Sequence, residues 1–189
     1  MIKKGLSLLR GILSPSITWK GNYGSWKEAK AASKGYNDDL IFNKVKSAAL
    51  EVRDKEDSFE RDGFVFNRIT VNPFFLSAVY RIKAKEKKAT LNVLDFGGSL
   101  GSVYKQHKKY LDLFSSIKWS VIEQHKFVEI GNTNFKHNNL FFYSKISEFT
   151  VEQGTPDLIL ISSTLQYLEA PYSILKELIA LGSKYLIMI

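Results

Sequence analysis

The residues with the clearest chemical potential follow two apolar runs in the second half of the chain. The first run, Thr90 to Leu94, leads into the turn Asp95-Phe96-Gly97-Gly98-Ser99-Leu100-Gly101, and the second run ends at Glu123. If both runs are strands of one parallel sheet, the two carboxylates lie at the same edge, where a strand-end acid can accept the hydroxyl groups of a ribose. This arrangement predicts a site for an adenosine-containing ligand.

The glycine turn does not match two common nucleotide sites. A Walker A loop needs Gly-Lys-Ser or Gly-Lys-Thr after its glycines, but the first lysine after the turn is Lys105. The dinucleotide pattern G-x-G-x-x-G also fails, because Ser99 stands where a second glycine would let the backbone approach the pyrophosphate. ATP hydrolysis and NAD binding are therefore not indicated.

The same turn fits the pattern acid-x-Gly-x-Gly-x-Gly with serine at the middle glycine. This resembles the first-strand motif of the class I methyltransferases that use S-adenosylmethionine (SAM). SAM has no phosphate, so such a loop accepts a sugar and a zwitterionic tail, and an acid at the strand end can hold the ammonium group or a bound water. The pattern alone leaves open a strand-to-helix turn without a ligand, and a helix-capping role for Glu123.

Polar residues also follow two later strands of the predicted sheet. The run Ser162-Ser163-Thr164-Leu165-Gln166-Tyr167 is expected to face the ligand, with Gln166 or Tyr167 near a substrate or the cofactor. Ser144 stands where class I enzymes often carry an acid that contacts the adenine amino group. Neither Gln166 nor Tyr167 has a pKa suited to general base catalysis. Methyl transfer from a sulfonium depends on in-line placement of the nucleophile, so the catalytic residue stays unassigned.

A wider set of short motifs extends from Trp19 to Ile189, and with it the chain resembles a family of class I methyltransferases encoded in bacterial surface-polysaccharide loci. The motifs are Trp19-x-Gly-x-Tyr23-x-Ser25-Trp26, Glu28-Ala29, Gly35-Tyr36, Glu60-Arg61-Asp62, Asp95 to Gly101, Trp119-x-Val121-x-Glu123-Gln124 and Ser162-Ser163-x-Leu165-Gln166-Tyr167-Leu168-x-x-Pro171. The resemblance implies a SAM-binding fold and a small-molecule or glycan-precursor substrate, in the cytoplasm or at the inner face of the membrane.

The motifs and the resemblance together define the expected site. Cofactor binding is expected from Asp95, Gly97, Gly98, Ser99, Gly101, Glu123, Gln124, Ser144 and Ser162. Contact with the methyl acceptor is expected from Trp26, Tyr36, Arg61, Gln166 and Tyr167. No metal is expected, because His107, His125 and His137 have no spacing typical of a metal site and are expected in exposed basic segments.

The pattern of elements predicts a helical N-terminal cap over residues 1–88 and a Rossmann-like core over residues 89–189, with a mostly parallel sheet and flanking helices. The last strands of a class I sheet are expected to be absent, which leaves the activity of the 189-residue form open. Expected helices cover Ser25–Gly35, Asp39–Arg53, a segment that begins at Asn72-Pro73, Ser102–Phe114, a segment to Gly131, and Pro171–Gly182. Expected strands cover Leu91–Asp95, Ile117–Glu123, Leu140–Tyr143, Asp157–Ser162 and Tyr185–Ile189. Asp54–Gly63 is expected to be a charged loop.

The net charge of +8, from 27 Lys and Arg against 19 Asp and Glu, favours anionic partners in general. Met1 to Leu13 has an apolar helical stripe, which fits a helix docked on protein or a peripheral membrane contact. Two alternatives to the enzyme therefore stay open: a non-catalytic module tethered at a membrane, and an RNA methyltransferase, for which net charge is the only support. The chain has no cysteine, which excludes disulfides and thiolate sites.

Overall fold

The computed structural model describes residues 21–33 and 39–189. Residues 21–33 belong to one compact unit and residues 39–189 to another, so each is described by itself. The expected helix from Met1 to Leu13, Trp19, Gly35 and the expected acceptor contact Tyr36 lie outside the described residues. The domain boundary expected between residues 88 and 89 stays a prediction.

The first unit contains the short helix α2, Trp26–Ala32. The helix begins directly after Ser25, which caps it together with Glu28 three residues later. The hydroxyl of Ser25 accepts a hydrogen bond from the backbone N–H of Glu28 at 3.3 Å, and the Glu28 carboxylate accepts one from Gly24 at 3.1 Å. The predicted helix start is confirmed, but the helix ends at Ala32 rather than at residue 35.

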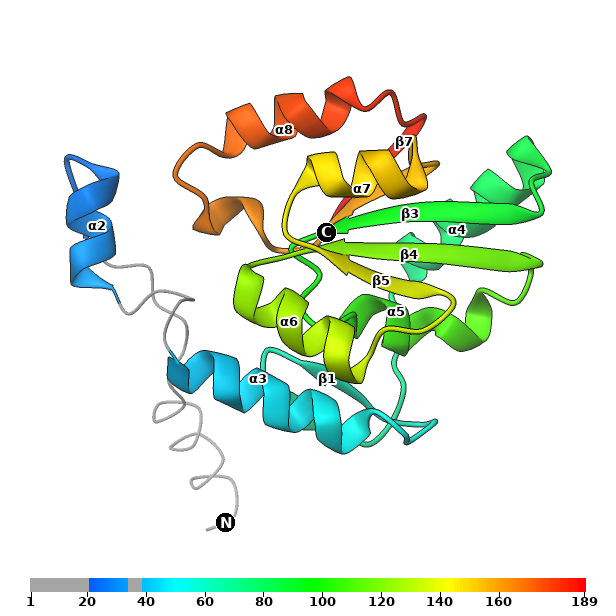
Figure 1. Ribbon diagram of the computed structural model, residues 1–189, viewed down its shortest axis with the longest axis horizontal. Helices are drawn as coiled ribbons and strands as arrows, with labels where there is room; N and C mark the ends of the chain where they lie inside the picture. The colour runs from blue at the N-terminus through cyan, green and yellow to red at the C-terminus, as the bar shows by residue number, and fades with distance from the viewer. Residues whose placement is uncertain (1–20, 34–38) are drawn as a thin grey trace, which may run out of the picture. The chain divides into compact units, whose positions relative to one another are not determined.

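The second unit is built around a five-stranded parallel sheet with the strand order β5-β4-β3-β6-β7 (Figure 1). The strands run in parallel on both sides of β3, so the chain winds outward in both directions from the centre, as in a Rossmann-like fold. The predicted fold class is confirmed. The strands are β3 Thr90–Phe96, β4 Ser116–Ile122, β5 Leu140–Tyr143, β6 Leu158–Ile161 and β7 Tyr185–Met188.

Helices cover both faces of this sheet, and alternate residues of each strand face opposite layers. Val93 packs into a cluster with α4 and α5, whereas its neighbour Leu94 packs into a cluster with α7 and α8. In Figure 1, α7 and α8 lie on one side of the sheet and α5 and α6 on the other. The helices of this unit are α3 Asp39–Val52, α4 Pro73–Glu86, α5 Ser102–His107, α6 His125–Asn134, α7 Ile146–Gln153 and α8 Pro171–Ala180, with short 3-10 turns η1 Lys108–Tyr110 and η2 Leu165–Tyr167.

The start of α4 follows from two adjacent residues. The Asn72 side chain accepts hydrogen bonds from the N–H groups of Phe74 and Phe75 at 3.0 and 3.1 Å, and Pro73 takes the first helical position, where no N–H is needed. The Asn72 N–H donates to Nε2 of His107 at 2.9 Å. The expectation that His107 is exposed is therefore wrong: it is fully buried, because its imidazole links α5 to the start of α4.

The structure corrects two local expectations and adds one helix that was not expected. Part of the expected loop over residues 54–63 instead forms a hairpin with the segment after it, with strands β1 Phe59–Arg61 and β2 Phe64–Phe66 joined by a turn at Asp62 and Gly63, both with positive φ. The helix after the glycine turn ends at His107 instead of reaching Phe114. Helix α7, which the sequence analysis does not predict, packs Ile146 and Phe149 against the sheet.

None of the helices in the described ranges, 21–33 and 39–189, is both long enough and apolar enough to span a lipid bilayer.

The cap of α4 leads to a direct prediction. Asn72→Ala removes the acceptor of two helix N–H groups, so we expect the free energy of unfolding in urea to fall by about 1 kcal/mol. Asn72→Ser keeps a capping oxygen and should recover most of that loss. Equal stability of the wild type and Asn72→Ala would show that water replaces the cap at no cost.

Candidate functional site

The ends of four neighbouring strands lie at one level of the sheet. Phe96, the last residue of β3, pairs with Ile122 on one side and with Ile161 on the other. Ile122 in turn pairs with Tyr143, the last residue of β5. The residues that follow directly therefore form one row along the carboxyl edge, which we call the strand-end row: Gly97, Glu123, Ser144 and Ser162.

The glycine turn begins at this row. Gly97 has φ +76° and donates its N–H to the carbonyl of Ile122 at 2.9 Å. A Cβ at Gly97 would overlap the side chain of Thr164, whose hydroxyl lies 2.9 Å from the Ser162 carbonyl and 3.2 Å from the Phe96 carbonyl. Through these contacts Thr164 connects the loop after β6 to the glycine turn. It was not among the predicted site residues, and no spacing in the sequence signals this contact.

Two further residues of the turn lie in the left-handed region of φ/ψ space. Ser99 has φ +55° and Gly101 has φ +83°, and the Gly101 N–H donates to the Gly98 carbonyl at 3.0 Å. A non-glycine residue rarely adopts such a φ, and residues of this kind often lie at ligand sites. Ser99 is partly exposed, so the strained backbone is open to a ligand from outside the sheet.

Asp95 lies beneath the turn rather than at its surface. Its side chain is fully buried, one carboxylate oxygen accepts the indole N–H of Trp119 at 3.0 Å, and the other oxygen has no hydrogen-bond partner among the described residues. A Cβ at Gly98 would overlap this carboxyl group, so the glycine lets the turn close directly over it. Burial raises the pKa of Asp95 to about 7, although the Trp119 bond opposes the shift.

Glu123 stands beside the turn on the adjacent strand. Its N–H donates to the Tyr143 carbonyl at 3.1 Å, and its side chain is partly exposed. Burial raises the pKa of Glu123 to about 7 as well, and its proximity contributes to the raised pKa of Asp95. Gln124 follows at the start of α6 with an exposed side chain that makes no capping bond. The charge of Glu123 therefore affects the ionisation of Asp95 at the neighbouring strand end.

The other predicted residues take different positions. The backbone N–H of Ser144 donates to Glu148 at 2.9 Å, which leaves its partly exposed hydroxyl at the strand-end row. Gln166 and Tyr167 are exposed on η2, just beyond the row. Arg61 lies on the β1–β2 hairpin and donates to Gln106 of α5 at 2.7 Å, so its guanidinium is directed at that helix. Trp26 belongs to the other unit and is 37% exposed.

The polar groups of this site suit a ligand with hydroxyl and ammonium groups. Glu123 offers carboxylate oxygens, Ser99, Ser144 and Ser162 offer hydroxyls, and the glycine turn leaves room for close approach of a ligand. Within the described parts of the chain, no group of three His, Asp or Glu residues is placed to hold a metal ion.

Comparison with known proteins finds no matching protein-family model and no matching curated protein. Matching solved structures include the plantazolicin methyltransferase BpumL in complex with a pentazolic desmethylPZN analog and SAH (22% identity, 62% of this chain, 48% of that chain, TM-score 0.44). They also include BpumL in complex with SAH (18% identity, 99% of this chain, 58% of that chain, TM-score 0.41). A third match is the plantazolicin methyltransferase BamL in complex with a triazolic desmethylPZN analog and SAH (15% identity, 76% of this chain, 55% of that chain, TM-score 0.36). The chain thus spans about half the length of these proteins, and similarities this low carry no argument about activity or substrate.

The buried carboxyl group makes stability depend on pH. Asp95 has a pKa of about 7 in the folded chain, against about 3.9 for an ordinary aspartate, so between these values only the folded state holds the proton. The free energy of unfolding therefore falls as pH rises from 4 to 7. Asp95→Asn stays neutral and keeps an acceptor for Trp119. Relative to the wild type it should gain stability over this range, by on the order of 4 kcal/mol at pH 8.

Urea denaturation of both proteins at pH 4, 5.5, 7 and 8 measures this difference. Parallel stability profiles for the wild type and Asp95→Asn would mean that Asp95 ionises normally in the folded chain.

Proposed function

We propose that this chain binds SAM and transfers its methyl group to a small molecule or a glycan precursor. The observation that supports this best is the strand-end row itself, in which Glu123 lies at the same level as Gly97, the residue that opens the left-handed turn. A carboxylate beside a glycine turn at the crevice of a doubly wound sheet is a common way to hold an adenosine.

The residues present fit this cofactor. Glu123 would accept the ribose hydroxyls, Ser144 would lie on the adenine side, and the backbone of Gly97 to Ser99 would face the amino-acid tail. Ser162 and Gln124 would complete the polar edge, and Asp95 would support the turn from below. When bound, SAM supplies an electrophilic methyl carbon on a sulfonium sulfur.

The protein would contribute to catalysis by positioning the methyl acceptor. Gln166 and Tyr167 are exposed immediately after the row and would orient an acceptor that enters from this side. Arg61, Trp26 and Tyr36 stay predicted acceptor contacts. The resemblance to enzymes of polysaccharide loci supports a glycan precursor in the cytoplasm, at the inner face of the membrane.

Calorimetric titration of the full chain with S-adenosylhomocysteine tests the cofactor. We expect saturable binding by the wild type and a loss of about tenfold to a hundredfold in affinity for Glu123→Gln, because a charge-assisted hydrogen bond becomes a neutral one. Glu129→Gln makes the same chemical change on the exposed surface of α6 and should bind as the wild type does. Absence of binding by folded wild-type protein would refute the proposed function.

The raised pKa of Glu123 provides a second, independent measurement. At pH 6 a group with a pKa of about 7 is mostly protonated, and hydroxyl groups that donate to it favour the carboxylate, so S-adenosylhomocysteine should displace a proton. The binding enthalpy should then differ between MES and imidazole buffers at pH 6, and not between two buffers at pH 8.5. Glu123→Gln should lose the difference, and a buffer effect that survives in this variant would exclude Glu123 as its source.

A further inference from the structure

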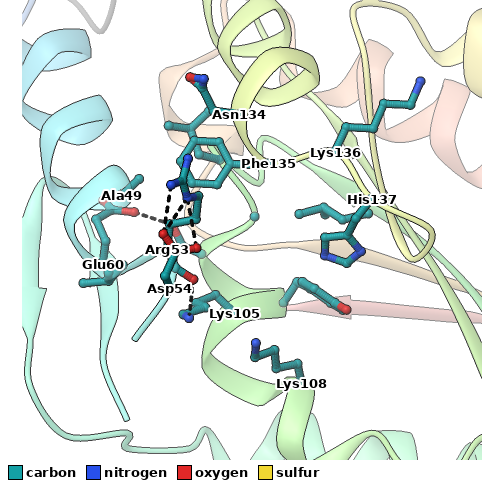
Figure 2. Close-up of a pocket in the computed structure, with 16 residues that line it drawn as sticks. Ala49, Arg53, Asp54, Glu60, Lys105, Lys108, Asn134, Phe135, Lys136 and His137 are labelled. Carbon is teal, nitrogen blue, oxygen red and sulfur yellow. Dashed lines mark hydrogen bonds and ion pairs between the residues drawn. The ribbon is translucent and has the colours of Figure 1, made fainter. Parts of the chain in front are cut away.

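A hollow lies along α5; none of the four residues of the strand-end row lines it, although Leu100 and Gly101 at the end of the glycine turn do. It has a volume of about 360 Å³ and is enclosed by the end of α3, the β1 strand, α5, and the segment from the end of α6 to the start of β5 (Figure 2). We call it the α5 cleft. Its apolar wall consists of Ala49, Val52, Leu100, Tyr104, Phe135 and Leu140.

Basic side chains dominate the polar wall of the α5 cleft. They are Arg53, Lys105, Lys108, Lys136 and His137, against the two acids Asp54 and Glu60. Both acids already have partners. Asp54 forms a two-pronged ion pair with Arg53, with N–O distances of 2.8 to 3.1 Å, and Glu60 accepts from the Ser102 hydroxyl at 2.6 Å and from the Gly63 N–H at 2.8 Å.

The positive charges are less well compensated. The Lys105 ammonium donates to the carbonyls of Arg53 and Lys55 at 2.9 and 2.5 Å, but the side chain of Lys108 has no hydrogen bond or ion pair with any residue in the described ranges. The charge of Lys108 contributes to the lowered pKa of both Lys105 and His137, after the larger effect of burial, so the three groups are crowded together. In Figure 2 the side chain of Lys136 extends away from the others.

His137 adds a directed donor to this group. Its Nδ1 accepts the N–H of Asn139 at 3.2 Å, so the neutral imidazole carries its proton on Nε2. The ring lies beside Tyr104, with 5.7 Å between ring centres. The lining of the cleft therefore includes an ammonium group without a hydrogen-bond or ion-pair partner among residues 21–33 and 39–189, an imidazole N–H, and apolar side chains.

We propose that the α5 cleft is a second ligand site, for a small molecule that carries a phosphate group on an apolar ring or chain. Arg53 is paired with Asp54 and Lys136 extends away from the group, so the positive charges next to His137 are those of Lys105 and Lys108, which would attract the charge of −1.5 to −2 on a phosphate monoester. Lys105 and Lys108 come from the continuous segment α5–η1 and His137 from the segment before β5, so a phosphate between them would be bound from two sides. The inference goes beyond the proposed methyl transfer and does not depend on it.

Titration with phenyl phosphate, followed by the imidazole NMR signals of the three histidines, tests this site. We expect a saturable shift of the His137 signal and an increase of its pKa, while exposed His125 stays unchanged. Inorganic phosphate should bind more weakly, because it leaves the apolar wall unused, and benzoate should bind more weakly because it carries a single charge. No saturable shift of His137, or a preference for benzoate, would overturn the proposal.

The charge at Lys108 gives a matched pair of variants. Lys108→Gln should weaken phenyl phosphate binding at least tenfold, and Lys108→Arg should restore it. Lys109→Gln removes the same charge from the neighbouring residue, which forms ion pairs with Glu56 and Asp57 and does not line the cleft, so it should bind as the wild type does. Equal weakening by both glutamine variants would show that only net charge attracts the anion.

Discussion

The pairing of β3 with both β4 and β6 is the constraint on which the rest of this molecule depends. Because Phe96 lies opposite Ile122 and Ile161, the polar residues that follow each strand reach the edge of the sheet together. A slip of one residue in any pair would turn a strand's core-facing residues toward the opposite helices and take the row apart. The apolar side chains on both faces of the sheet hold this register, so the core determines the geometry of the site.

Two features with an energetic cost lie at the glycine turn, and features of the same kinds also occur elsewhere in the described residues. Asp95 is a buried carboxyl group with one oxygen unsatisfied, and Ser99 holds a left-handed backbone without the freedom of glycine. The indole N–H of Trp119 offsets part of the cost of burying Asp95. Proteins typically keep such destabilising features where a ligand later interacts with them. That both features occur within five residues of the turn is compatible with a ligand site there.

The sequence predicts much of this architecture because the relevant signals are local. The strand over Leu140–Tyr143 and the start of α4 at Asn72 and Pro73 depend on neighbouring residues, and both are confirmed. The β1–β2 hairpin was missed because its strands have three residues each and β1 carries two charged residues. Helix α7 was missed because only Ile146 and Phe149 anchor it.

The same reasoning explains which parts of the sites were predicted. The residues that end each strand follow from the strand boundaries, so the sequence places Glu123 beside the turn. Contacts between distant segments have no such signal. The bond from Trp119 to Asp95, the contact of Thr164 with Gly97, and the α5 cleft all depend on tertiary packing.

The central position of β3 also determines the order in which its two partner strands are synthesised. Its partner β4 follows closely along the chain, whereas Leu158, which pairs with Val93 from β6, is synthesised much later. Shorter loops close at lower entropic cost, and a nascent chain emerges with its N-terminus first. All residues of β3, β4 and β5 are therefore made before those of β6, and the edge of β3 that β6 covers is the later of its two edges to gain a partner.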